Sequence, residues 1–397
     1  MRDPFAEIAS DPRLQRYAWA ILGGHVIVAL YFLNTNTLSL LLARNEPICW
    51  PHFADCWQIR FDSIEPIRFL LAGYGVLIVF AGVQLGRAKW RSWWWLLLCA
   101  NLYLFGLVSL DYRYRANEFY MLFWLNLVFL FSPAKRWSVP LVLVSFYVWA
   151  GTLKLNREWM SGAVLYHPLW LIPSGLTAAA CVYVVVLEMV MSWGLLARRR
   201  SIRLGALAQF ALFHVQSLSQ IHWFYPALMG TMLYWFLLPE LDGNPSDVSI
   251  KRLFTGRAPL AGYAVMGTFA AFQLAPHLYR GDPALTGQGR ALALHMFQAR
   301  QICEITGIVH WRDRPPTEID LRMPTLPPRT ICDPIVYFNR IQNICRSRRD
   351  DPAFIDVDFI MKVRRTTDPS FRTVVDEAMF CGKNYRYSPV FDNKWLR

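Results

Sequence analysis

The sequence predicts an α-helical polytopic membrane protein of about nine transmembrane helices, followed by a small extracytoplasmic α+β domain that is mainly β. Three observations lead to this fold class. First, 55% of the residues are hydrophobic and only 17% are charged, whereas soluble domains carry roughly 25% charged residues. Second, long apolar segments recur along the first two-thirds of the chain. Third, these segments then stop, which divides the chain into a helical bundle, 1–277, and an outer domain, 278–397.

Each apolar segment is close to the roughly 20 residues that a helix needs to cross a bilayer. The first segment follows a polar stretch that ends in Arg13 and Arg16, and it is too long for the apolar core of a signal peptide. We therefore expect it to remain in the membrane. The fourth and eighth segments are short, as in a tilted, broken or partly re-entrant helix. The predicted segments are 17–43, 66–86, 92–111, 118–133, 138–155, 172–197, 204–221, 225–239 and 259–276.

Basic side chains predict the orientation, because short loops rich in Lys and Arg stay on the cytoplasmic side of a membrane. Such clusters follow the second, fourth, sixth and eighth segments. The N-terminus is therefore predicted to be cytoplasmic and the C-terminal domain extracytoplasmic, in a multi-pass protein of the plasma or inner membrane. These loops and the tail also account for the net charge of +13, so we expect no nucleic-acid partner. The clusters contain Arg87, Lys89, Arg91, Lys135, Arg136, Arg198, Arg199, Arg200, Arg203, Lys251, Arg252 and Arg257.

The cysteines support the same orientation. Two lie in the first outer loop and four in the tail, and disulfides persist outside the cytoplasm. We expect one bridge in the loop and two in the tail, where the sequence leaves the pairing open. No Cys/His spacing indicates a metal site. The six cysteines are Cys49, Cys56, Cys303, Cys332, Cys345 and Cys381, while Cys99 and Cys181 fall in membrane segments and are expected to be free.

The tail has the pattern of a small mixed domain. Residues 354–363 alternate as a strand does, and residues 333–345 could form a helix. At roughly 120 residues the core is modest, so we expect disulfides or the membrane to support it.

Ionisable side chains within the apolar segments are the best pointers to chemistry, because they are costly in a membrane and usually face a cavity or a partner. Several of them lie toward the predicted outer ends of their segments, so they could share one outward-facing cavity. The candidates are His25, Glu118, Lys154, Glu188, His214 and His222.

Lys154 is the most informative of these residues. One interpretation is a lysine that extends from a helix end to the membrane surface. The other is a lysine held in a dry pocket, where burial disfavours the ammonium form and makes the amine a usable general base.

The other candidates also have structural interpretations. Glu118 could simply favour a helix N-terminus, Glu188 could be paired across helices, and His214 could be an interhelical histidine with satisfied hydrogen bonds. The polar run that follows His214 is harder to explain structurally, because so many hydrogen-bonding groups in a membrane segment indicate a lined cavity. Together with Asn117, the predicted cavity residues are Gln216, Ser217, Gln220 and His222.

Four stretches resemble the vitamin K-dependent gamma-carboxylase family and its bacterial relatives, the HTTM-domain proteins. Tyr147–Gly162 is similar to the family's segment that ends in Ala-Gly, Lys-Leu-Asp and Trp-x-x-Gly. The run from Phe213-His214 to Phe224-Tyr-Pro226 is similar to its His-x-x-Asn-Ser-Gln segment. The likeness continues in Arg280–Gly289 up to Met296, and in the tail in Cys332–Arg340 and Phe354–Phe359.

The resemblance implies a quinol-dependent carboxylase and epoxidase of the lyase or oxygenase type, which needs reduced vitamin K or menaquinol and no metal. Lys154 falls on the family's catalytic lysine, and Glu118 and His214 would assist it. The substrate would be a peptide or protein glutamate on the outer side. One departure matters: Asn117-Glu118 stands where the family has Asn-His. The tail also has no room for the propeptide-binding region of the animal enzyme.

The alternative is a catalytically divergent or inactive HTTM protein that contacts membrane lipid and acts as a partner in envelope assembly or export. The replacement of the family's histidine at position 118 favours this alternative. A transporter is disfavoured because no inverted repeat is visible.

Overall fold

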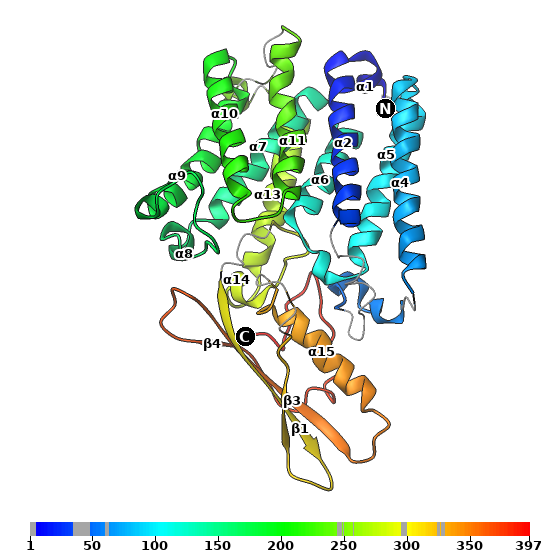
Figure 1. Cartoon of the computed structure of the whole chain (residues 1–397), viewed down its shortest axis with the longest axis vertical. Helices are drawn as coiled ribbons and strands as arrows, with labels where there is room; N and C mark the ends of the chain where they lie inside the picture. The colour runs from blue at the N-terminus through cyan, green and yellow to red at the C-terminus, as the bar shows by residue number, and fades with distance from the viewer. Residues whose placement is uncertain are drawn as a thin grey trace.

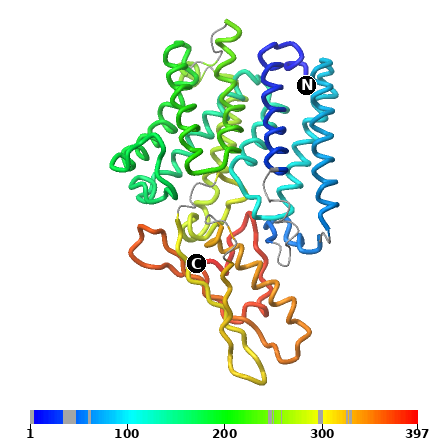
Figure 2. Tube along the Cα trace, in the orientation of Figure 1, coloured from blue at the N-terminus to red at the C-terminus, as the bar shows by residue number. Residues whose placement is uncertain are grey.

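The computed structural model describes residues 5–34, 48–59, 63–243, 248, 250–256, 258–294, 300–323, 326 and 330–397. It shows a mostly helical protein whose C-terminal part contains a four-stranded antiparallel sheet (Figures 1 and 2). Three sequence predictions fall on residues outside these ranges: the end of the first apolar segment at 35–43, the basic residue Arg257, and Met296 of the family-like stretch.

Every predicted apolar segment coincides with a helix. The sixth segment is divided, because the long helix within it is flanked by two 3₁₀ turns, η4 (Ser174–Leu176) and η5 (Met191–Leu196). The long helices are α2 (Pro12–Asn34), α4 (Glu65–Gly86), α5 (Trp90–Ser109), α6 (Asn117–Phe131), α7 (Lys135–Leu153), α9 (Thr177–Met189), α10 (Arg200–Ser217), α11 (Phe224–Leu241) and α13 (Leu260–Leu274).

Short elements connect them. These are α1 (Ala6–Ser10), α8 (Arg157–Met160), α12 (Ile250–Phe254) and α14 (Pro283–Thr286), with the 3₁₀ turns η1 (Pro51–Phe53), η2 (Cys56–Gln58), η3 (Tyr112–Tyr114) and η6 (Ala275–Leu278).

Among the residues that the structure describes, three helices are long and apolar enough to cross a membrane: Pro12–Leu33, α4 and α5. The most apolar window of α4 has a mean hydropathy of 2.0, yet only 22% of it is buried within the protein. Phe69, Val79 and Phe80 are among its exposed side chains. A helix that is apolar on its uncovered side is typical of a membrane environment.

A polar network joins four helices inside the bundle. Nδ1 of His25 lies 2.7 Å from the Tyr74 hydroxyl, and Nε2 of His25 lies 3.0 Å from Nδ2 of Asn126. Asn126 also donates to Oδ1 of Asn101. His25 is therefore part of the packing of α2, α4, α5 and α6, because buried polar groups must find partners within the protein.

The C-terminal domain consists of a sheet with one helix packed against it. Its strands are β1 (Gln301–Trp311), β2 (Thr317–Asp320), β3 (Phe354–Arg365) and β4 (Arg372–Glu377), in the antiparallel order β2-β1-β3-β4. Helix α15 (Pro334–Ser347) buries an apolar stripe that includes Ile335, Phe338 and Ile341. The predictions of a strand at 354–363 and a helix at 333–345 are confirmed.

Three disulfides stabilise this end of the protein, as predicted. Cys49 pairs with Cys56 in the first loop, and the structure resolves the open pairing in the tail as Cys303–Cys332 and Cys345–Cys381. Cys99 and Cys181 are free cysteines. Membrane-length helices together with disulfides in the C-terminal domain are consistent with an extracytoplasmic location for that domain.

The first loop packs directly against the C-terminal domain. The side chain of Asn339 on α15 accepts a hydrogen bond from the backbone N–H of Cys49 (3.1 Å) and donates one to its carbonyl (3.3 Å). In Figure 1 this domain lies at the end of the bundle opposite the N-terminus. Helix α1 and the start of α2 lie at the end of the bundle that holds the N-terminus (Figure 1), where Arg136 pairs with Asp11 at 2.5 Å.

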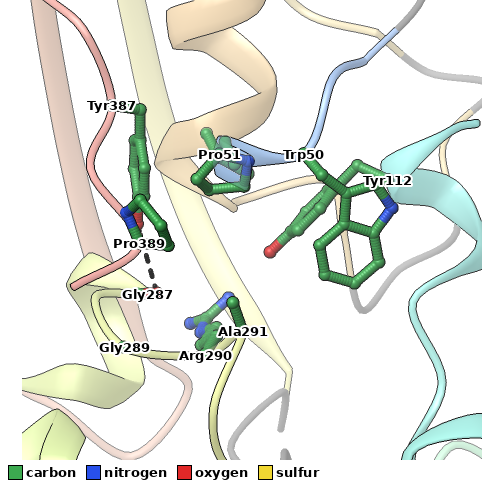
Figure 3. A pocket seen from close by; sticks show the side chains of 10 residues that line it. Trp50, Pro51, Tyr112, Gly287, Gly289, Arg290, Ala291, Tyr387 and Pro389 are labelled. Atoms are coloured by element: carbon green, nitrogen blue, oxygen red, sulfur yellow. Dashed lines mark hydrogen bonds between the residues drawn. The ribbon is translucent and has the colours of Figure 1, made fainter. Parts of the chain in front are cut away.

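A buried charge cluster completes this junction. One oxygen of Asp333 accepts hydrogen bonds from Tyr112 (2.8 Å), Arg115 (2.5 Å) and Arg290 (2.6 Å). Burial on its own raises the pKa of Asp333, but the two guanidinium groups outweigh it and hold this pKa below its usual value. Figure 3 shows a small cavity of about 10 Å³ beside Arg290, with Tyr112 on one side and Tyr387 on the other.

Candidate functional site

A cavity of about 1330 Å³ opens at the end of the helical bundle that faces the C-terminal domain. Its wall extends from Tyr31 near the end of α2 and Glu118 at the start of α6 to the outer helices α9 and α10. The loop between α8 and α9, the turn at 218–222 and the residues Arg113, Arg115 and Thr330 also belong to the wall. This volume is larger than the roughly 300–1,000 Å³ of ordinary small-molecule pockets, so the cavity can hold a bulky ligand.

Lys154 lines the cavity and forms a buried ion pair. It is the residue that follows α7, and its ammonium donates to Glu188 of α9 and, at 3.4 Å, to the carbonyl of Ala150. The two side chains of the pair are 2% and 1% exposed. Lys154 Nζ also lies 5.0 Å from the centre of the Trp159 ring. Lys154 is therefore buried and paired, whereas a lysine that extends to the membrane surface would be exposed.

Close helix packing makes this pair possible. A Cβ added at Gly151 would lie 2.6 Å from Cγ of Met189 and 3.1 Å from Cβ of Glu188, so α7 and α9 meet where α7 has no side chain. This contact brings the carboxylate of Glu188 to the end of α7. A buried charge needs such a partner, because leaving one charge alone costs about 3–5 kcal/mol.

Glu118 and Asn117 line another part of the cavity, in the first turn of α6. The backbone of Ala116 is extended, and α6 begins directly after it. A carboxylate here is favoured by the helix dipole. Because the side chain of Glu118 also faces the cavity, it can accept a hydrogen bond from a bound ligand.

Two glutamines of the polar run hold the cavity wall in place. Oε1 of Gln216 accepts from the backbone N–H of Leu171 at 2.9 Å. The amide of Gln220 accepts from the N–H of Tyr166 at 3.1 Å and donates to the carbonyl of His167 at 2.6 Å. Both residues line the cavity, and these contacts anchor the loop between α8 and α9 that forms part of its wall.

The remaining predicted residues fall into two groups. Ser217 and His222 also line the cavity, although the hydroxyl of Ser217 donates back to the carbonyl of His214 at 2.6 Å. His214 lies one layer behind the lining, with Nε2 2.9 Å from the Tyr147 hydroxyl and its ring against Tyr225. Its Nδ1 has no hydrogen-bond partner among the residues that the structure describes.

Sequence reasoning left two parts of the site unassigned. Glu188 was recognised as an unusual membrane carboxylate but was not connected with Lys154, which lies 34 residues away. The apolar loop from Val164 to Pro173 was not assigned to the wall. The sequence feature that could have identified this loop as part of the wall is its run of Leu, Trp and Ile between two helices. Within the described ranges, no group of three His, Cys, Asp or Glu side chains is arranged to hold a metal ion.

Comparison of the whole chain with protein-family models, with curated proteins and with solved structures returns no match in any of the three. The likeness to the gamma-carboxylase and HTTM proteins thus remains a prediction from the sequence motifs, and the functional argument depends on the geometry of the cavity.

Proposed function

We propose that this chain is a membrane enzyme of the gamma-carboxylase-like type that binds a reduced quinone in the large cavity and uses Lys154 as a general base. The observation that carries the proposal is the ion pair of Lys154 and Glu188, buried at the wall of a cavity of about 1330 Å³. Ionisable groups in a membrane bundle are usually functional. The cavity has room for a two-ring quinol head group and part of its chain.

Glu188 gives the lysine a route to its basic form. An ammonium cannot accept a proton, so Lys154 must first lose one. In a site of low dielectric, transfer of that proton to Glu188 replaces two opposite charges by a neutral amine and a neutral acid. The amine can then take the proton of a quinol hydroxyl. When bound, a reduced quinone together with oxygen would supply the strong base that removes the Cγ proton of a glutamate.

Other lining residues would orient the ligand. Glu118 can accept a hydrogen bond from a quinol hydroxyl. It cannot reproduce every role of the histidine found in the family, because a carboxylate has no proton to donate. Trp159, whose ring lies beside Lys154, offers an aromatic face for stacking against the head group.

The proposal includes the membrane topology. We infer about nine transmembrane helices, a cytoplasmic N-terminus and an extracytoplasmic C-terminal domain in the plasma or inner membrane. Support comes from the basic loops, which follow alternate helices, and from the disulfides at the other end of the bundle. A peptide or protein glutamate would then reach the cavity from the outer side.

The test is formation of quinone epoxide by the purified full-length protein with menaquinol and oxygen. We expect Lys154→Ala to lower the rate by about 10²–10⁴-fold, the usual contribution of a general base, and Glu188→Gln to lower it as well. Lys135→Ala is a matched control, because Lys135 is a buried lysine at the other end of α7 that donates to the carbonyl of Ser132. No epoxide from the wild type, or equal rates with Lys154→Ala, would reject the proposal.

The second candidate function is a non-catalytic partner in envelope assembly or export. It is favoured by Glu118, which occupies the position of the family's histidine. In that case the wild type would form no epoxide with any quinol, and the disulfide-bonded C-terminal domain would be the part that binds a partner.

A further inference from the structure

The wall of the large cavity is continuous with an exposed apolar surface of the bundle. Tyr183 of α9 and Leu212 of α10 both line the cavity, and they are 45% and 58% exposed. Beside them, Val186 on α9 and Val215 on α10 are exposed but do not belong to the lining. These helices belong to the part of the chain that resembles a membrane bundle, so their exposed apolar faces are expected to contact lipid chains.

A hydrogen bond between two side chains joins α9 and α10 at the cavity wall. The hydroxyl of Tyr183 donates to Oε1 of Gln209, and both residues line the cavity. This is a contact between two side chains, so it can open by a change of rotamer while both helices stay in place. Two small residues on α9, Ala179 and Ala180, also line the cavity and leave space for a ligand.

The cavity lining contains both charged and apolar side chains. Lys154 at the end of α7 and Glu118 at the start of α6 provide charged groups, whereas Leu187 of α9 and Leu212 and Phe213 of α10 are apolar. An amphiphile fits this arrangement, with its hydrogen-bonding head in the bundle and its hydrocarbon chain directed toward the lipid.

We propose that the gap between α9 and α10, closed by Tyr183 and Gln209, is a lateral portal through which the chain of a long-chain ligand extends into the bilayer. The site is then loaded from the membrane and not from the aqueous side. The identity of the head group as a quinol and the exposure of α9 and α10 to lipid rest on the proposed function, while the position of the portal depends on the cavity and its lining.

The first experiment measures equilibrium binding of two quinones to the purified full-length protein in detergent. Menaquinone-4 carries a chain of isoprene units, and menadione has the same ring without the chain. We expect Leu212→Trp to fill the portal and weaken menaquinone-4 binding at least about tenfold, while menadione binding changes less than about twofold. Val215→Trp, on the same helix but outside the lining, should change neither. Equal weakening of both ligands by Leu212→Trp, or no effect on menaquinone-4, overturns the portal.

The second experiment does not depend on a quinone. The protein is placed in phosphatidylcholine vesicles that contain a phosphatidylcholine with a photoreactive group at the end of one acyl chain. Leu187 lines the cavity but is only 1% exposed, so labelling of Leu187 reports an acyl chain inside the cavity, and the Leu212→Trp variant tests the route by which the chain entered. We expect labelling at Leu187 in the wild type and in Val215→Trp, and its loss in Leu212→Trp. Absence of this labelling in the wild type overturns the portal. Labelling without any quinone binding instead supports the portal and rejects the quinol-dependent function.

Discussion

Replacement of Asp333 by asparagine tests the junction between the bundle and the C-terminal domain. One oxygen of Asp333 receives hydrogen bonds from two buried arginines, Arg115 and Arg290, and from Tyr112. The variant leaves two buried positive charges without a carboxylate. The substituted side chain can still cap α15, because asparagine and aspartate are about equally good caps. The loss therefore comes from the charge cluster, and breaking a buried pair costs about 3–5 kcal/mol.

Hydrogen–deuterium exchange measures this loss locally. A cost of about 3–5 kcal/mol corresponds to roughly a hundred-fold to several-thousand-fold faster exchange of the protected amides in α15 and β3. The matched control is Asp320→Asn, which removes an exposed carboxylate paired with Arg322 in the same domain, and which should leave this exchange unchanged. Unchanged protection of α15 in the Asp333 variant, or an equal effect of Asp320→Asn, would refute the reasoning.

The same residue predicts a pH dependence. The pKa of Asp333 is held below its ordinary value, by arginines that outweigh the effect of burial. A carboxylate with a lowered pKa in the folded state stabilises the fold above its ordinary pKa, about 3.9, and that stability is lost as the pH falls through the lowered value. Protection of the C-terminal domain should therefore fall in acid in the wild type, and this step should be missing in the Asp333 variant.

Two further changes test other contacts. Gly151→Ala places a Cβ 2.6 Å from Cγ of Met189 and should destabilise the protein by about 1–3 kcal/mol in thermal unfolding, whereas Gly75→Ala, which meets nothing within 4 Å, should not. Burial raises the pKa of Glu158 and outweighs the hydrogen bond that Thr366 donates to it at 2.7 Å, so the folded state favours the protonated acid and the stability around Glu158 should fall as the pH rises through that raised pKa. Glu158→Gln should abolish this dependence in exchange measurements of the Thr366 turn, and a persistent pH step would contradict the assignment.

The positions of the helices could be predicted because hydropathy is a local property of the sequence. The residues of segment 66–86 are by themselves enough to predict a helix that crosses a bilayer, and the bounds of α4 agree with this segment within one residue. The sixth segment was predicted less well. Its helix ends at Met189 and gives way to a 3₁₀ turn, in which an added Cβ on Gly194 would lie 3.2 Å from Ala206 of α10. The hydropathy of a sequence does not reveal such close approaches between helices.

Pairings across the fold could not be predicted from the sequence. The number of disulfides could be predicted by counting cysteines, but the partners of Cys303 and Cys345 depend on how the sheet and α15 pack. The sequence likewise predicted that Lys154 lies near the outer end of its helix, but it did not identify Glu188 as the partner of Lys154. The position of His214 behind the cavity lining depends on the rotation of α10 about its axis, which a predominantly apolar helix does not specify.

The contact between Asn339 and Cys49 has a consequence for the order in which the protein is assembled. The two residues are 290 positions apart, so at about 5–20 residues per second the first loop is synthesised roughly 15–60 s before its binding partner. During that time the loop lacks its contact with Asn339. Its disulfide joins cysteines only seven positions apart, so both thiols become available for oxidation together. A failure to oxidise this loop should therefore appear as an undocked C-terminal domain on a bundle that has already been inserted.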